Sequence, residues 1–175
     1  MTGIEHRREF ANYFAARRDT VRRTAYLLCG DWHWADDLTQ ITFVRLADAW
    51  SRVRQPAALD AFTRTCLVRV YLAESRRLFR RRERASAVLP EVGQADHADR
   101  INTRLEVIEA MATLPPRQRA TLVCRFYQGL SVQETAEVLD CSIGTIKSQT
   151  SRGLAALRRL LGTALDDPSL DEVRR

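Results

Sequence analysis

The residues best suited to contact DNA bases lie near the C-terminus, in a segment spanning 131–161. This segment is expected to form a short helix, a three-residue break at 140–142 and a second helix. One face of the second helix carries apolar residues and a threonine every three or four positions, and is expected to pack inward: Ile143, Ile146, Thr150, Leu154, Leu157 and Leu161. The opposite face presents hydrogen-bonding and cationic side chains: Thr145, Ser148, Gln149, Arg152 and Arg159, with Lys147 and Ser151 on its flank.

Local signals define the ends of these two helices. Ser131 and Glu134 have the spacing of a capping box, and Ser142 is expected to cap the second helix. The small Ala136 lies where two helices joined by a tight turn must approach closely. The pattern predicts a helix-turn-helix that fits a DNA major groove. The alternative is an ordinary helical hairpin with a solvated outer face.

A second cationic cluster ends an earlier helix. Six arginines lie between Arg76 and Arg84, against the single acid Glu83. Cations are mildly favoured at a helix C-terminus, but six exceed what that effect requires. Neutralisation of several phosphates explains them better, and it predicts binding that weakens steeply with salt. A solvated, arginine-rich helix end remains the alternative.

Composition limits the class of protein. The 175 residues are 45% hydrophobic and 29% charged, with a net charge of +6, which favours a protein with real cores and an anionic partner. No apolar run approaches the roughly 18 residues of a membrane span, and no signal-peptide core is present, so we expect a cytoplasmic location. The four cysteines and three histidines are scattered, which predicts buried thiols in a reducing compartment, no metal site and no cofactor.

Charge alternates along the chain in blocks. Residues 1–84 carry a net charge of +7, residues 85–112 carry −3, residues 113–161 carry +4 and residues 162–175 carry −2. Two basic blocks separated by an acidic stretch suggest two domains and a linker. We expect domains at 1–84 and 103–161, a flexible acidic linker at 85–102 and a disordered acidic tail at 162–175.

Apolar periodicity predicts five further helices, at about 5–29, 32–52, 58–84, 103–112 and 116–127. Gly30 is expected to end the first, Asp31 to cap the second, and Pro116 to begin the last. The helix at 58–84 has one inward face, widened by Leu67 and Leu72: Leu59, Phe62, Cys66, Val70 and Ala73. With no strand and no repeat, the fold class is expected to be all-α.

The 32–52 helix is expected to have an inward face and an unusual outer face. The inward face consists of Ala35, Leu38, Thr42, Phe43, Leu46, Ala49 and Trp50. The outer face combines Asp37 and Gln40 with the β-branched apolar residues Ile41 and Val44. Apolar residues on a face expected to be wet suggest a protein contact. Two exposed apolar residues also occur without any function, so periodicity alone leaves both interpretations open.

Two blocks of sequence in one chain resemble a known family. WADDLTQITFVRLADAW (34–50) resembles the acidic, polymerase-docking helix of sigma-70-type transcription initiation factors. LPPRQRATLVCRFYQGLSVQETAEVLDCSIGTIKSQTSRGLAALRRLL (114–161) resembles their promoter-reading C-terminal domain, and FTRTCLVRVYLAESRRLFRRR (62–82) is similar to the SigE-like actinobacterial branch. With these two domains and a short linker, the chain resembles an extracytoplasmic-function sigma factor, with a sigma-2-like domain and a helix-turn-helix sigma-4-like domain.

The resemblance implies partners and site residues. Core RNA polymerase is expected to bind through its β′ clamp helices and β flap. Its clamp helices are expected to meet the 32–52 helix: Asp36, Asp37, Gln40, Ile41, Phe43 and Val44. Promoter DNA near −10 is expected to meet the loop around 54–59 and the helix that follows it: Arg54, Gln55, Leu59, Arg69, Arg76, Arg77, Arg80 and Arg81. The −35 element is expected to meet the second domain: Arg117, Arg119, Thr145, Lys147, Ser148, Gln149, Ser151 and Arg152. An anti-sigma factor is a further expected partner.

Three positions depart from the family pattern. Ile41 stands where an acid is usual, Asp140 where the turn commonly has glycine, and Arg69 where the SigE-like branch often has asparagine. Asp tolerates a left-handed backbone better than most residues, so the turn is expected to survive.

Two other classes of protein make different predictions. A stand-alone helix-turn-helix regulator would bind duplex DNA tightly without polymerase. An enzyme acting on nucleic acid would need converging carboxylates or a Ser/Cys/His constellation, and the sequence carries no recognisable catalytic motif, so no enzymatic activity is expected.

Overall fold

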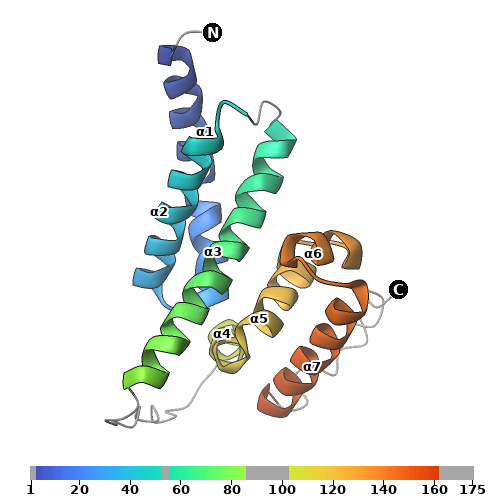
Figure 1. Cartoon of the computed structure of the whole chain (residues 1–175). Helices are drawn as coiled ribbons and strands as arrows, with labels where there is room; N and C mark the ends of the chain where they lie inside the picture. The colour runs from blue at the N-terminus through green and yellow to red at the C-terminus, as the bar shows by residue number, and fades with distance from the viewer. Residues whose placement is uncertain (1–2, 53–55, 86–102, 162–175) are drawn as a thin grey trace.

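The computed structural model of this chain describes residues 3–52, 56–85 and 103–161, which form two packed helical units (Figure 1). The first unit consists of α1 (Gly3–Cys29), α2 (Trp32–Ala49) and α3 (Pro56–Ala85). The second consists of α4 (Thr103–Thr113), α5 (Pro116–Leu122), the π-helical turn η1 (Val123–Tyr127), α6 (Val132–Leu139) and α7 (Ile143–Leu161). The all-α class is confirmed, and these ranges contain no strand. Residues 86–102 of the predicted linker and the predicted tail at 162–175 lie outside the described residues.

Local signals set the helix ends where they were predicted. Gly30 ends α1 with a φ of +76°, a conformation that favours glycine. The Asp31 carboxylate caps α2 by accepting a hydrogen bond of 2.7 Å from the backbone N–H of Trp34. Pro116 is the first residue of α5, where its missing N–H leaves no helical hydrogen bond unmade.

The first unit is built on apolar side chains from three helices. Leu28 of α1 and Leu38 and Leu46 of α2 are fully buried. Near the middle of α1, the ring of Phe14 meets that of Phe43 edge-on, with 4.7 Å between their centroids. The inward face predicted for α2 is therefore confirmed.

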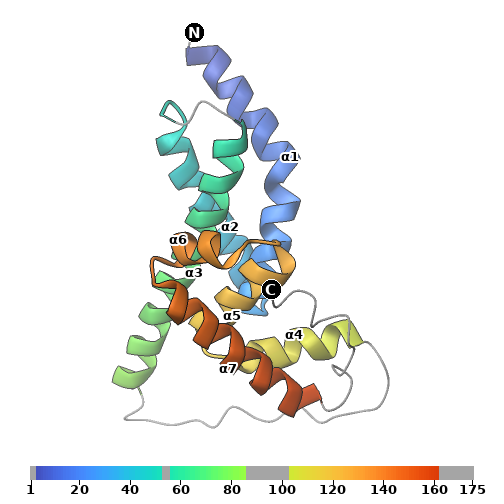
Figure 2. The same ribbon diagram turned by 90° about the vertical axis from the view of Figure 1, so that its right-hand side faces the viewer.

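Helix α3 is buried on more than its predicted face. Besides Leu67 and Val70, its neighbours Val68 and Tyr71 are almost completely buried, at 0% and 1% exposure. The reason is that α5 and α6 pack against α3 in addition to α1 and α2 (Figures 1 and 2). The middle of α3 thus belongs to the cores of both units, which periodicity did not predict.

The segment predicted as one helix at 116–127 changes geometry in its last turn. At its end the backbone N–H of Gln128 donates to the carbonyl of Val123, five residues earlier, at 3.0 Å. The prediction of a continuous α-helix is therefore wrong from Val123 onward. The guanidinium of Arg125 donates to the carbonyl of Leu130 and braces the loop that leads into α6.

Arg119 joins the two units from inside the protein. It lies on α5, yet its side chain is only 6% exposed. Its guanidinium donates to the carbonyl of Leu28 at the end of α1, at 2.9 Å, and to the carbonyls of Ala112 and Leu114. A cation is favoured at these helix ends because the last carbonyls have no partner within the helix.

Arg69 makes the reciprocal contact from the first unit. Its guanidinium donates to the carbonyls of Glu137 and Val138, at 3.2 and 3.3 Å, near the C-terminal end of α6. Each unit therefore places an arginine on a helix C-terminus of the other. These bonds are more exposed than those of Arg119 and longer than its bond to Leu28, so they contribute less to the packing.

We predict that Arg119→Ala lowers the free energy of unfolding by about 3 kcal/mol, because it leaves several carbonyls at the boundary without their donor. Arg117→Ala is the matched control, since Arg117 lies on the same helix and is exposed, and it should change stability by less than about 0.5 kcal/mol. Urea unfolding followed by circular dichroism measures both. Equal stability of the two variants would contradict the role given to Arg119.

Candidate nucleic-acid and protein-binding surfaces

The helix-turn-helix begins with the predicted capping box. The Ser131 hydroxyl accepts a hydrogen bond of 3.1 Å from the backbone N–H of Glu134, and the Glu134 carboxylate accepts one of 2.7 Å from the N–H of Ser131. The hydrogen bond from the Ser131 N–H lowers the pKa of Glu134 below its usual value. Both donors at the start of α6 are thereby satisfied.

The turn between α6 and α7 depends on one left-handed residue. Asp140 has φ 49° and ψ 61°, and it is the only described residue other than glycine with a positive φ. The N–H of Cys141 donates to the carbonyl of Ala136 at 3.0 Å, which closes the end of α6. The expectation that the turn survives with aspartate is confirmed.

Helix α7 packs through a stripe close to the predicted one. Ile146 and Leu157 are buried, at 0% and 6% exposure. Gly153, which the sequence reading overlooked, is buried where α7 approaches α5: a Cβ atom there would lie 3.0 Å from Leu122. Ile143 was wrongly assigned to the inward stripe, because it is 44% exposed. Ile143 precedes Ile146 by three residues, so the two side chains point about 60° apart around the helix axis. In the first turn of α7 this rotation leaves Ile143 outside the packed stripe.

The opposite face of α7 is open to solvent and carries most of the predicted base-reading residues. Four of them are exposed: Lys147, Ser148, Ser151 and Arg152. Thr145 and Gln149 are half-buried. The Ser142 hydroxyl caps α7 by accepting from the Thr145 N–H at 3.1 Å, as predicted, and its oxygen lies 2.9 Å from the Thr145 hydroxyl.

The two arginines predicted to hold phosphates at the start of α5 differ completely in environment. Arg117 is exposed. Arg119 is buried and bonded to backbone carbonyls, so its assignment to phosphate is corrected: in this arrangement it is a structural residue. Burial also lowers the pKa of its guanidinium from the usual value, although an arginine remains charged at neutral pH.

The last turns of α3 present the second basic surface. Its four predicted DNA residues are exposed: Arg76, Arg77, Arg80 and Arg81. Arg77 pairs with Glu74 at 3.1 Å, but the pair is largely exposed and weak. Phe79, among these arginines, is 63% exposed. The sequence reading missed this side chain, although an aromatic residue between arginines is a recognisable signal for stacking on nucleic-acid bases.

Four further residues were predicted to contact the −10 element: Arg54, Gln55, Leu59 and Arg69. Leu59 is a core residue at 7% exposure, so its proposed contact with DNA is corrected. The guanidinium of Arg69 donates to two carbonyls of α6 and would have to break these hydrogen bonds to reach DNA. Arg54 and Gln55 lie outside the described residues.

The outer face of α2 exposes most of the predicted polymerase-binding residues. Asp37 and Gln40 are exposed, Val44 is 62% exposed and Ile41 is half-buried. Asp37, Gln40 and Ile41 line a shallow hollow of about 580 Å³ together with residues of α3, including Leu78. This surface combines an acid, an amide and apolar side chains, as a protein-binding site requires.

Asp36 and Phe43 are not part of that open surface. Both carboxylate oxygens of Asp36 accept from Arg22 of α1, at 2.5 and 3.1 Å, and these hydrogen bonds lower the pKa of Asp36. Phe43 is 4% exposed, so its assignment as a direct polymerase contact is corrected to a core residue. Arg22 also lies over the ring of Trp32, 4.5 Å from its centroid.

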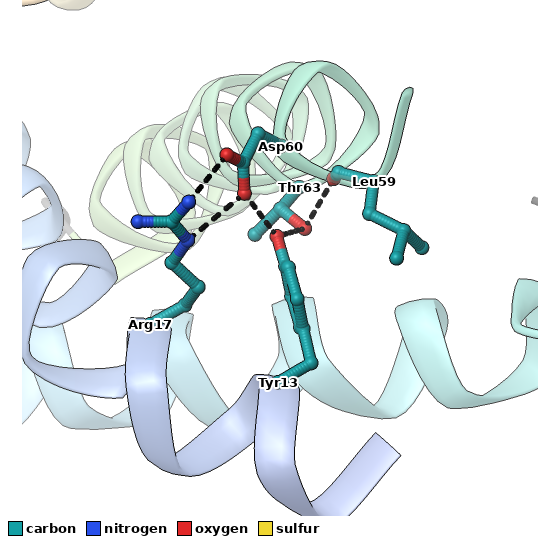
Figure 3. Close-up of polar contacts among 5 residues, drawn as sticks. All are labelled: Tyr13, Arg17, Leu59, Asp60 and Thr63. Atoms are coloured by element: carbon teal, nitrogen blue, oxygen red, sulfur yellow. Dashed lines mark hydrogen bonds and ion pairs between the residues drawn. The ribbon is translucent and has the colours of Figure 1, made fainter. Parts of the chain in front are cut away.

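A polar cluster that the sequence did not predict fastens α1 to the start of α3 (Figure 3). The Tyr13 hydroxyl donates to Asp60 at 2.8 Å and lies 3.0 Å from the hydroxyl of Thr63. Arg17 donates twice to the Asp60 carboxylate, at 2.7 and 3.0 Å. Burial raises the pKa of Tyr13 to about 12. This cluster fixes the first turn of α3, next to the segment predicted to contact the −10 element.

The described residues hold no group of three or more His, Cys, Asp or Glu side chains placed to bind a metal ion. Three free cysteines are buried (Cys29, Cys66 and Cys124), and Cys141 is half-buried. Burial raises the pKa of Cys124 to about 12. Among the described helices, none is both long enough and apolar enough to cross a membrane.

Comparison with known proteins identifies the family. Residues 13–84 match the Sigma-70 region 2 family, and residues 104–157 match the Sigma-70, region 4 family. The chain is 31% identical over 168 residues to the RNA polymerase sigma-E factor of Streptomyces coelicolor, an alignment that covers 95% of this chain and 94% of that protein. It is also 31% identical to the ECF RNA polymerase sigma factor SigM of Mycobacterium tuberculosis, across 87% of this chain and 77% of that protein. The chain therefore belongs to the sigma-70 family of RNA polymerase sigma factors, in its extracytoplasmic-function group.

A solved structure shares the fold. The sigma factor RpoE of Bartonella quintana, crystallised in complex with the anti-sigma factor NepR, superposes with a TM-score of 0.71 at 24% identity. The match covers 89% of this chain and 98% of that one.

We predict that Tyr13→Phe lowers stability by about 1 kcal/mol at pH 7, because the hydrogen bonds of the hydroxyl are lost while Asp60 keeps Arg17. An unfolded tyrosine titrates near pH 10, below the folded value of about 12. The contribution of Tyr13 is therefore complete below pH 10 and is lost as the pH rises from 10 to 12. Urea unfolding at pH 8, 10 and 11 should show the gap between wild type and variant shrinking.

Tyr127→Phe is the control, because Tyr127 is 49% exposed and its hydroxyl should add little to stability at any of these pH values. A gap between wild type and Tyr13→Phe that stayed constant from pH 8 to 11 would contradict the burial of the Tyr13 hydroxyl.

Proposed function

We propose that this chain binds core RNA polymerase and directs it to specific promoters, with the α1–α3 unit at the −10 element and the helix-turn-helix at the −35 element. The observation that carries the proposal is the presence of both sigma-70 regions, in order, within one chain. A lone helix-turn-helix would support only binding to duplex DNA. We also propose that the functional domains follow the divisions expected from charge, 1–84 and 103–161, with a connecting segment at 85–102 and a tail at 162–175.

The open surface of α2 is the proposed polymerase site. Asp37, Gln40 and Val44 are accessible together on one face. Asp36 supports this face indirectly, since its ion pair with Arg22 ties α2 to α1. The β′ clamp helices and the β flap are the partners expected from the family, with the clamp helices at this surface.

The two exposed cationic surfaces are the proposed promoter contacts. Arginines at the end of α3 would neutralise phosphates while Phe79 stacks on an unpaired base. Exposed side chains of α7 would meet base edges in the major groove, with Arg117 on a neighbouring phosphate.

We propose that the chain has no catalytic activity of its own and acts in the cytoplasm through its partners. An anti-sigma factor is one of these partners: the related RpoE of Bartonella quintana forms such a complex with NepR. The competing proposal, a regulator that acts without polymerase, is supported only by the helix-turn-helix itself and leaves the α2 surface without a role.

Run-off transcription with purified core polymerase tests the proposed function. Core enzyme with this protein should initiate at discrete sites in a genomic template library, whereas core enzyme alone should not. Initiation no better than that of core alone on every template would overturn the proposal. Tight binding to one duplex site without polymerase would favour the competing regulator.

We predict that Asp37→Arg combined with Gln40→Ala reduces binding to core polymerase at least tenfold, because it reverses a charge and removes an amide at the centre of the α2 surface. Asp48→Arg is the matched control: it reverses an exposed acid on the same helix, outside the predicted surface. Affinity is measured by fluorescence anisotropy, with circular dichroism to verify folding. Undiminished binding by the double variant would refute this interface.

We predict that Arg152→Ala costs about 1–3 kcal/mol at one promoter position and relaxes base preference there. Arg159→Ala, an exposed arginine two turns further along α7, should leave base preference unchanged. Binding to promoters substituted base by base within the −35 element measures the effect. A uniform loss across all sequences would make Arg152 a phosphate contact instead.

A further inference from the structure

An apolar groove of about 720 Å³ lies between α4, η1 and α7 in the second unit. Its floor is formed by buried or half-buried apolar side chains, among them Met111, Leu122, Leu154 and Leu157. Two aromatic residues of η1 line it while remaining open to solvent, Phe126 at 41% and Tyr127 at 49% exposure. The π-helical turn places these two side chains beside the groove. A concave apolar surface of this size is suited to holding a peptide segment.

The groove reaches the face of α7 that carries the predicted base contacts. Lys147 and Ser151 both line it and are both exposed. Three cations, Arg125, Lys147 and Arg158, stand among its apolar residues. A segment with carboxylates beside apolar side chains would therefore match both the cations and the apolar lining of the groove. It would also cover part of the DNA-reading face.

The chain itself supplies a segment with this chemistry. After α7 ends at Leu161, 14 residues follow, with a net charge of −2 from four acids and two arginines. The acids form two adjacent pairs, and each pair follows a leucine: Leu165-Asp166-Asp167 and Leu170-Asp171-Glu172, with Val173 next. The two arginines come last, at 174 and 175, so the stretch 165–173 itself carries acids and no base.

The position of this segment also favours the groove. From Leu161 back to Lys147 along α7 is about 21 Å, at 1.5 Å per helical residue. Fourteen residues span up to about 46 Å when extended, so the segment is long enough to turn and run back along α7. Because the segment is tethered at the groove's edge, its effective concentration there is of millimolar order, and modest intrinsic affinity suffices.

We propose that residues 165–173 dock in the groove between α4, η1 and α7 and cover Lys147 and Ser151, so that the tail competes with DNA for the second unit. The apolar residues Leu165 and Leu170 occupy the floor, and the acids face the three cations. The competition with DNA rests on the proposed function, whereas the docking does not. Release of the tail would then be a step in exposing the −35 surface.

Lys147 is the only lysine of the chain, which allows a direct test. A water-soluble carbodiimide joins the Lys147 amine to a carboxylate as an amide, and the reagent leaves as the urea. Docking predicts a cross-link in monomeric protein between tryptic peptide 126–152, no longer cleaved at Lys147, and tryptic peptide 160–174. Lys147→Arg keeps the charge but removes the amine, and it should abolish this product.

The decisive comparison is Leu165→Ser with Leu170→Ser in the full chain. This variant keeps every carboxylate and the tether but loses the apolar anchors, so docking predicts a cross-link yield lower by about fivefold or more. An unchanged yield would mean random encounter of a tethered acid and would overturn the proposal. Cross-links only between two copies, or only to carboxylates of the folded units, would also overturn it.

A second measurement separates docking from masking. Binding of wild type and of the Leu165→Ser, Leu170→Ser variant to random-sequence duplex DNA is compared at low salt. Masking predicts tighter binding by the variant, by the ratio of the fraction of variant chains whose groove is free to the same fraction in wild type. Equal affinities alongside the expected cross-link change would overturn the competition with DNA. The cross-linking experiments involve neither polymerase nor DNA. They therefore test the docking of the tail even if the protein does not support transcription.

Discussion

A single buried cation, the guanidinium of Arg119, constrains how the two halves of this protein meet. Burying an arginine is costly unless its donors are satisfied. Here the two terminal nitrogens donate to the backbone carbonyls of Leu28, Ala112 and Leu114, while the Nε–H has no partner among the described residues. These acceptors lie at the ends of α1 and α4, so few orientations of α5 satisfy all of them. Since α5 leads through η1 to α6 and α7, the position of the helix-turn-helix follows from this contact.

The consequence is a shared core around α3. Its middle packs against α1 and α2 on one side and against α5 and α6 on the other, while its arginine-rich end remains exposed. The two cationic surfaces thus lie on separate helices held in one packed body, and neither is buried by the packing. Arg69 differs from the other predicted DNA-binding arginines of α3, because its guanidinium donates to two carbonyls of α6. Engagement of Arg69 by DNA therefore requires its side chain to leave these carbonyls.

The site was predictable where the signal was local, and unpredictable where it depended on a distant partner. Ser131, Glu134 and Asp140 act within a few residues of themselves, so their spacing was sufficient to place the caps and the turn. Periodicity predicted Phe43 and Leu59 on the inward faces of their helices, and both are core residues. Their proposed contacts with polymerase and DNA came from the resemblance alone, and burial under neighbouring helices excludes them. The π-helical turn at 123–127 carries no periodic signal that separates it from an α-helix, so its exposed aromatic residues and the groove beside them were not foreseen.

The sequence by itself determined the all-α class, the ends of most helices, the apolar face of α2 and the helix-turn-helix, because capping and 3.6-residue periodicity act at short range. Only the tertiary structure decided which charged side chains are available to a partner. Arg117 and Arg119 are two residues apart on one helix, yet one is exposed and the other is buried against three carbonyls. They differ because Arg119 donates to the carbonyl of Leu28 at the end of α1, about ninety residues earlier in the chain. That hydrogen bond exists only when the two units pack.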